Sequence, residues 1–127
     1  MTASSAQSRW RHRATALATI GVFLWLVARF WHPVYGFTAF FQLDAANDDL
    51  KITAFRALPV FVHRDTGGYD GLYYAQLAHD PTLRDPELPR AMDNFAYRAR
   101  RILPAAVAWL LGLGRGAWII HTYSLLN

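Results

Sequence analysis

The chain contains no cysteine and few charged residues. Only 17% of its 127 residues are charged, whereas 54% are hydrophobic and 15% aromatic. The absence of cysteine excludes a disulfide framework and any thiolate site, although it leaves the cellular compartment open. The low charge and high apolar content are unusual for an ordinary soluble domain with one core.

Acidic residues are absent from both ends of the chain, since all nine lie between Asp44 and Asp93. Residues 1–32 carry four basic residues and no acid, and residues 101–127 carry two basic residues and no acid. The basic excess therefore flanks apolar segments instead of forming a patch, and we expect no nucleic-acid partner.

Regularly spaced histidines are also missing. The five histidines never occur four residues apart, so the sequence predicts no histidine metal site. Two short sequences match known motifs by chance, because the structural elements that the motifs require are missing around them. "HRD" at 63–65 has no glycine-rich ATP loop beside it, and "GLGRGA" at 112–117 follows an apolar helix instead of a strand.

A long uncharged run begins at Ala14 and ends at Ala28, and "RFW" follows it. Together these residues predict a membrane-spanning helix of about 27 Å, preceded by basic residues that place the N-terminus in the cytoplasm. A cleaved signal peptide is the alternative, but no small-residue cleavage site follows the run.

The remaining apolar segments extend this prediction to a multipass protein of the bacterial inner membrane. We expect an all-α, integral membrane fold that is the N-terminal fragment of a longer helical bundle. Its predicted parts are a cytoplasmic N-terminus (1–13), transmembrane helix 1 (14–32), a long extracytoplasmic loop with short helices (33–94), transmembrane helix 2 (95–114), a cytoplasmic turn (115–116) and the start of a truncated helix 3 (117–127).

The long loop is the candidate functional region, because loops of such length commonly carry function. Its sequence predicts one helix from Asp44 to Leu58 and another from Asp70 to His79, each ended by a following proline or Asp-Pro pair. The stretch "GGYDGLYY" at 67–74 covers the turn before the second helix and its first residues, and it places Asp70 between aromatic and glycine residues. Asp70 is a candidate N-cap of the second helix and a candidate chemical group presented at a site, and the two roles are not exclusive.

Two stretches carry a resemblance to known proteins. "GGYDGLYYAQLAHDP" and "MDNFAYRARRILPAAVAWLLGLG" resemble the first loop and second membrane helix of an uncharacterised group of bacterial multipass membrane proteins. The aromatic-Asp-Gly sequence at 69–71 more distantly resembles the first-loop signature of GT-C fold glycosyltransferases, which take sugars from polyprenyl-phosphate donors.

This resemblance implies a catalytic acid at Asp70, acting as general base on an acceptor hydroxyl or helping to place a divalent metal. Asp65 is near Asp70 in the sequence and is a candidate second acid and metal ligand. Arg98 and Arg101 would then hold the donor phosphate, because residues three apart share a helix face. The aromatic residues that would line the sugar pocket are Tyr69, Tyr73 and Tyr74.

Simpler interpretations of these residues stay open. The arginines and tyrosines are also typical anchors at a membrane interface, and Asp93 is a candidate cap of the following helix. The predicted partners are membrane lipid, a polyprenyl-phosphate sugar donor and the remaining helices of a full-length protein. The alternatives to a glycosyltransferase are a non-enzymatic transporter or lipid-binding protein, and an inactive fragment.

Overall fold

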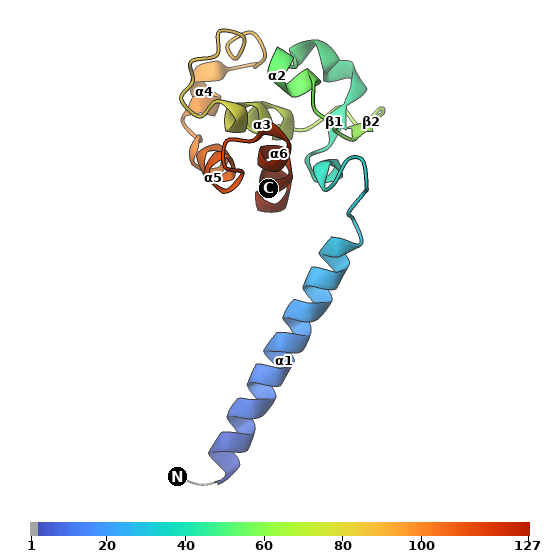
Figure 1. Ribbon diagram of the computed structural model, residues 1–127, viewed down its shortest axis with the longest axis vertical. Helices are drawn as coiled ribbons and strands as arrows, with labels where there is room; N and C mark the ends of the chain where they lie inside the picture. The colour runs from blue at the N-terminus through green and yellow to red at the C-terminus, as the bar shows by residue number, and fades with distance from the viewer. Residues whose placement is uncertain (1–2) are drawn as a thin grey trace. The chain divides into compact units, whose positions relative to one another are not determined.

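The computed structural model describes the backbone of residues 3–127 and the side chains from residue 8 onward. The chain divides into two compact units, Met1–Trp31 and His32–Asn127. The first unit is the helix α1 (Ala3–Ala28), and the second holds all the other elements (Figure 1).

The helix α1 ends earlier than the sequence predicts. It stops at Ala28, and the amides of Phe30 and Trp31 bond three residues back in a closing turn. The uncharged part of the helix therefore runs only from Ala14 to Ala28, which is roughly 22 Å at the helical rise and shorter than the apolar core of a bilayer.

The predicted second span is divided in the structure. The helices α4 (Phe95–Ala99) and α5 (Leu103–Leu111) replace one continuous helix over 95–114, and α6 (Gly116–Leu126) follows. Pro104 lies in the first turn of α5, where its missing N–H costs nothing, so it marks a helix start and not an interior kink.

The predicted membrane fold is therefore wrong. Within residues 3–127, every helix falls short of the length or the apolar character that crossing a bilayer requires. The expectations of an integral membrane bundle and of a multipass protein in the inner membrane are overturned by this finding. The chain is mostly helical, as expected, but it also contains one short pair of strands.

The strands are β1 (Leu43–Asp44) and β2 (Val62–His63), which pair in parallel with Leu43 opposite Val62. Around them lie the short helices η1 (Thr38–Phe41), η2 (Ala45–Leu50) and α2 (Thr53–Arg56). The predicted helix from Asp44 to Leu58 is thus broken near Ile52, whose amide donates to Oε1 of the buried Gln76 at 2.7 Å. A contact from a distant helix replaces the bond that would have continued the local helix.

The helix α3 (Gly71–His79) is the centre of the second unit and confirms the helix predicted over 70–79. It contacts α2, α4, α5 and α6, and Figure 1 shows it between α2 on one side and the α5–α6 pair on the other. The shared core of these elements is apolar and buried; its largest side chains are Phe41, Leu43, Ile52, Phe55, Leu77, Leu88, Ile119 and Ile120.

Two glycines allow the close packing of this core. A Cβ atom at Gly71 would lie 2.7 Å from Cβ of Phe41, so the start of α3 can approach η1 only because residue 71 has no side chain. A Cβ atom at Gly112 would lie 2.7 Å from the backbone nitrogen of Ile119, at the junction of α5 and α6. The first of these contacts fixes where residue 70 lies.

Candidate functional site

Asp70 lies directly before α3, but its side chain does not cap the helix. Its backbone is helical, with φ −52° and ψ −17°, and the carboxylate makes no bond to the free amides of the first turn. Both carboxylate oxygens instead accept from the guanidinium of Arg98, one of them from Nη2 at 2.8 Å and the other from Nη1. The capping role expected for Asp70 is therefore wrong, and the residue is oriented by an ion pair.

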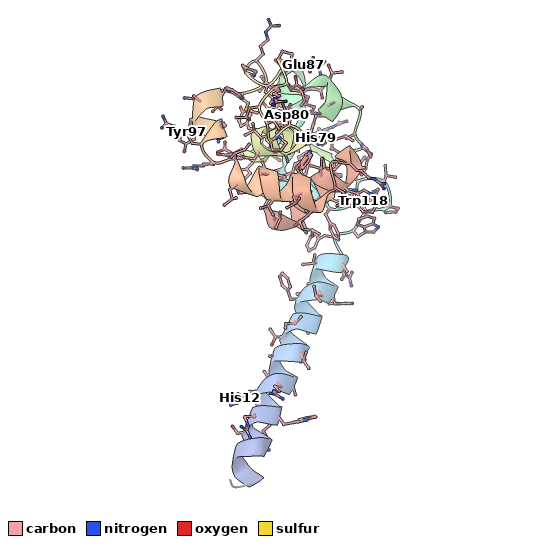
Figure 2. All side chains as sticks on the ribbon, turned by 60° about the vertical axis from the view of Figure 1, so that its left-hand side comes forward. His12, His79, Asp80, Glu87, Tyr97 and Trp118 are labelled. Atoms are coloured by element: carbon pink, nitrogen blue, oxygen red, sulfur yellow. The ribbon has the colours of Figure 1, made fainter. Side chains whose placement is uncertain are left out.

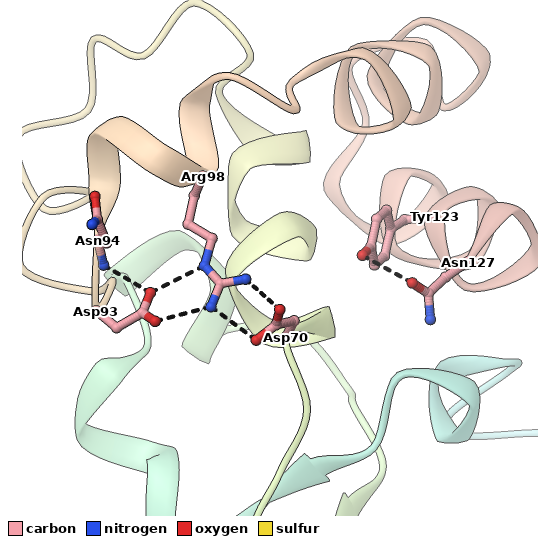
Figure 3. Close-up of polar contacts among 6 residues, drawn as sticks. All are labelled: Asp70, Asp93, Asn94, Arg98, Tyr123 and Asn127. Atoms are coloured by element: carbon pink, nitrogen blue, oxygen red, sulfur yellow. Dashed lines mark hydrogen bonds and ion pairs between the residues drawn. The ribbon is translucent and has the colours of Figure 1, made fainter.

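Arg98 holds a second carboxylate in the same plane. Its Nε donates to Oδ1 of Asp93 at 3.0 Å and its Nη2 donates to Oδ2 at 2.9 Å, as Figure 3 shows. The cap of α4 is Asn94, whose Oδ1 accepts from the amide of Tyr97 at 3.0 Å, so the expected capping role of Asp93 is also wrong. One guanidinium thus joins the segments before α3 and α4.

The burial of this cluster is uneven. The Arg98 side chain is 7% exposed, whereas those of Asp70 and Asp93 are 49% and 51% exposed. The hydrogen bonds that Arg98 donates to Asp93 and Asp70 raise the pKa of Arg98, and the bond to Asp93 is the largest cause that lowers the pKa of Asp93. Two carboxylates and one guanidinium leave the cluster with one net negative charge, on its solvent side.

Three tyrosine rings surround the buried guanidinium. Its central carbon lies 4.7 Å from the ring centre of Tyr73, and 5.6 Å from those of Tyr74 and Tyr97. Such cation–π contacts favour the charged arginine in a partly desolvated position. Burial is the largest cause that raises the pKa of Tyr73, and Asp93 adds to it. Tyr73 and Tyr74 therefore help to hold Arg98, a role that the sequence did not predict.

The exposed side of Asp70 opens into a cleft of about 360 Å³. Tyr69, Asp70, Leu72 and Tyr73 line it from α3 and the residues before it, and the loop glycines Gly67 and Gly68 with Asn47 line the other side. The glycines have φ values of 73° and 71°, which side chains rarely tolerate, so backbone approaches the cleft closely there. The arrangement brings a carboxylate, two aromatic rings, an amide and bare backbone around one space.

The glycine loop is fixed by Asp44, which the sequence analysis did not select. Its buried carboxylate accepts from the amide of Ala46 at 2.8 Å, and from the amide and hydroxyl of Thr66 at 2.7 and 2.9 Å. The amides of Ala46 and Thr66 are the largest causes that lower the Asp44 pKa. No local pattern could have indicated this role, because it depends on the pairing of β1 with β2.

Asp65 lies on the same loop but outside the cleft lining. Its side chain is exposed and its backbone has a φ of 59°. No group of three His, Asp or Glu side chains among the described residues is arranged to hold a metal ion. Asp65 is therefore not among the residues that line the cleft beside Asp70.

Arg101 lies in a second cleft, apart from Asp70. This cleft of about 220 Å³ is lined by Tyr74, Arg101, Pro104, Tyr123, Leu126 and Asn127. The guanidinium carbon of Arg101 lies 4.9 Å from the ring centre of Tyr97, which Figure 2 shows on the outer side of α4. The Tyr123 hydroxyl donates to Asn127 at 3.3 Å, as seen in Figure 3. Arg98 and Arg101 thus face different surroundings, although both lie near Tyr74.

Comparison with family models, with curated proteins and with solved structures finds no match for this chain.

Proposed function

We propose that the second unit binds a sugar in the cleft at Asp70 and takes part in glycosyl transfer. The observation that carries this proposal is the half-exposed Asp70 carboxylate, which Arg98 orients toward a cleft walled by Tyr69 and Tyr73. Sugar rings bind by stacking their apolar faces on aromatic rings while their hydroxyls donate to carboxylates.

In this reaction Asp70 is the general base. The acceptor hydroxyl donates to a carboxylate oxygen of Asp70, and its proton moves to that oxygen as the hydroxyl oxygen bonds to the anomeric carbon of the donor. The bond from the anomeric carbon to the phosphate oxygen breaks, and its electron pair leaves with the phosphate. Arg98 stays protonated throughout and keeps the carboxylate in place.

The donor that we propose is a polyprenyl-phosphate sugar, and Arg101 is the cation for its phosphate. Arg101 is exposed and forms no ion pair within residues 8–127, so its guanidinium can donate two hydrogen bonds to one phosphate. Pro104 and Leu126 supply apolar surface beside it in the second cleft. Arg98 is not assigned to this phosphate, because four of its five N–H donors are already bonded to Asp70 and Asp93.

A second candidate function is sugar binding without transfer. It is favoured by the bonding of both Asp70 oxygens to Arg98, which orients the carboxylate to accept a hydrogen bond from a sugar hydroxyl whether or not a proton is transferred. The two candidates share the cleft and differ only in whether a proton leaves the bound hydroxyl.

One experiment separates them. The purified chain is incubated with radiolabelled polyprenyl-phosphate sugars and an oligosaccharide acceptor, and Asp70→Asn is compared with Asp49→Asn, an exposed acid outside the cleft. Loss of the base predicts a fall in transfer of about 10²–10⁴-fold for Asp70→Asn and none for Asp49→Asn. Transfer that survives Asp70→Asn would refute the catalytic role, and binding without any transfer would establish the second candidate.

The donor site has its own test. Arg101→Gln is expected to raise the KM for the donor about tenfold or more, because a charge-assisted phosphate contact is lost. Arg115→Gln is the matched control, since Arg115 lies at the start of α6, where its guanidinium carbon is 5.5 Å from the ring centre of Trp118. An equal effect of both substitutions would remove Arg101 from the donor site.

A further inference from the structure

Asn47 is a polar side chain on the cleft wall that the proposed reaction does not use. It lies in η2 at a kink where its φ is −101° and its ψ is 21°, and its side chain is half-buried. A Cβ atom at Gly68 would lie 2.4 Å from Nδ2 of Asn47, so the amide is packed directly against the glycine backbone. This contact holds the amide at the cleft, on the wall opposite α3.

The amide of Asn47 is uncommitted. Within the described part of the chain the Asn47 side-chain amide forms no hydrogen bond. The carboxylate of the neighbouring Asp44 accepts hydrogen bonds from Ala46 and Thr66 instead. An asparagine amide offers two donor hydrogens and an acceptor oxygen, which match a hydroxyl in either direction. A fixed but unused amide beside the half-exposed Asp70 is therefore a second polar contact for a ligand.

The charges around the cleft restrict that ligand further. The cluster of Asp70, Asp93 and Arg98 has one net negative charge, and Asn47 adds none. An anionic sugar would bring a negative charge toward the negative charge of Asp70. The positive charge of Arg98 cannot offset this repulsion, because Asp70 and Asp93 already neutralise it. Neutral sugars with hydroxyls suit the cleft better than uronic acids do.

We propose that Asn47 is a specificity-determining residue, which binds the hydroxyl next to the one bound by Asp70. The ligand of the cleft is then a neutral sugar with two adjacent hydroxyls. This inference rests on the proposed function, because it assumes that the cleft at Asp70 is a sugar site.

The test uses the full chain and titrates neutral methyl glycosides, observed by protein NMR shifts. The probes are methyl mannoside, methyl glucoside and methyl galactoside, each also in a deoxy form that lacks one hydroxyl of a pair, with methyl glucuronide as the anionic probe. Loss of one hydrogen bond predicts that Asn47→Ala weakens the preferred diol about five- to tenfold. The variant should bind the diol and its deoxy form alike.

Control variants separate the possible failures. Asn127→Ala removes an amide of the same kind from the other cleft and should leave glycoside binding unchanged. Asn47→Asp keeps the shape of the side chain but adds a negative charge, so it should bind methyl glucuronide more weakly than the wild type does. If the wild type binds no glycoside, or if Asp70→Asn leaves binding unchanged, the sugar site itself is refuted. If Asp70→Asn abolishes binding but both Asn47 variants keep the wild-type preference for the diol, only the role of Asn47 is refuted.

Discussion

Arg98 is the residue whose loss should disturb the second unit most. Its guanidinium makes four hydrogen bonds, two to Asp70 and two to Asp93, and it lies among three tyrosine rings. Arg98→Met keeps most of the side-chain stem but removes every one of these bonds. The substitution therefore tests whether the cluster joins the segments before α3 and α4.

The expected loss of stability follows from the exposure of the partners. Removing one member of a fully buried ion pair costs about 3–5 kcal/mol, and exposed pairs contribute only about 0–1 kcal/mol. Asp70 and Asp93 are 49% and 51% exposed, so water can solvate them when Arg98 is gone. We expect a loss of about 3 kcal/mol, or roughly 12–24 °C in Tm for a unit of this size.

The assay is urea and thermal unfolding, followed by circular dichroism, with Arg100→Met as the control. Arg100 is exposed and carries no ion pair in the described chain, so its loss should cost less than about 0.5 kcal/mol. A double-mutant cycle with Asp70→Asn should give a coupling of about 1–2 kcal/mol. Equal stability of Arg98→Met and Arg100→Met would refute the reasoning, and so would a coupling near zero.

Three further predictions concern the same unit. Burial lowers the pKa of His79 to about 4, so the folded state binds fewer protons than the unfolded state, and stability should fall by up to about 3 kcal/mol as the pH drops from about 6.5 to 4. His79→Gln should flatten this dependence in unfolding curves. Gly71→Ala should cost about 1–3 kcal/mol in urea unfolding, because its Cβ meets Phe41. Asp44→Ala should speed amide hydrogen exchange at 66–70, since the loop loses its bonds to the carboxylate.

Each of these has a control within the chain. His12 is exposed on α1, so His12→Gln should leave the pH dependence as it is. A Cβ atom at Gly67 meets nothing within 4 Å, so Gly67→Ala should show only the backbone strain of about 1 kcal/mol. Asp49→Ala should leave loop exchange unchanged. Each prediction fails on one result. It fails for His79 if His79→Gln keeps the pH dependence of stability, and for Gly71 if Gly71→Ala unfolds at the same urea concentration as the wild type. It fails for Asp44 if Asp44→Ala leaves amide exchange at 66–70 unchanged.

The sequence predicted the helix α3 well. This helix is encoded locally, by a helical run between a glycine turn and an Asp-Pro pair. The role of Asp70 stays a prediction. The membrane spans were predicted from apolar runs and from the basic and aromatic residues that flank them, and this prediction was wrong. Apolar residues over 95–126 form short helices that turn back at Gly112–Arg115 and bury Ile119 and Ile120 in a shared core.

What the sequence by itself determined is therefore local: apolar periodicity, helix stop signals and the candidate acid. The tertiary structure decided which groups meet. Arg98 binds Asp70, which lies 28 residues away in the sequence, and Asp44 binds Thr66 of the glycine loop, which lies 22 residues away. No local spacing in the sequence could therefore predict these two contacts. Ion pairs of this kind depend on where α3, α4 and the strand pair are placed, and that placement is set by core packing among Phe41, Phe55 and Ile120.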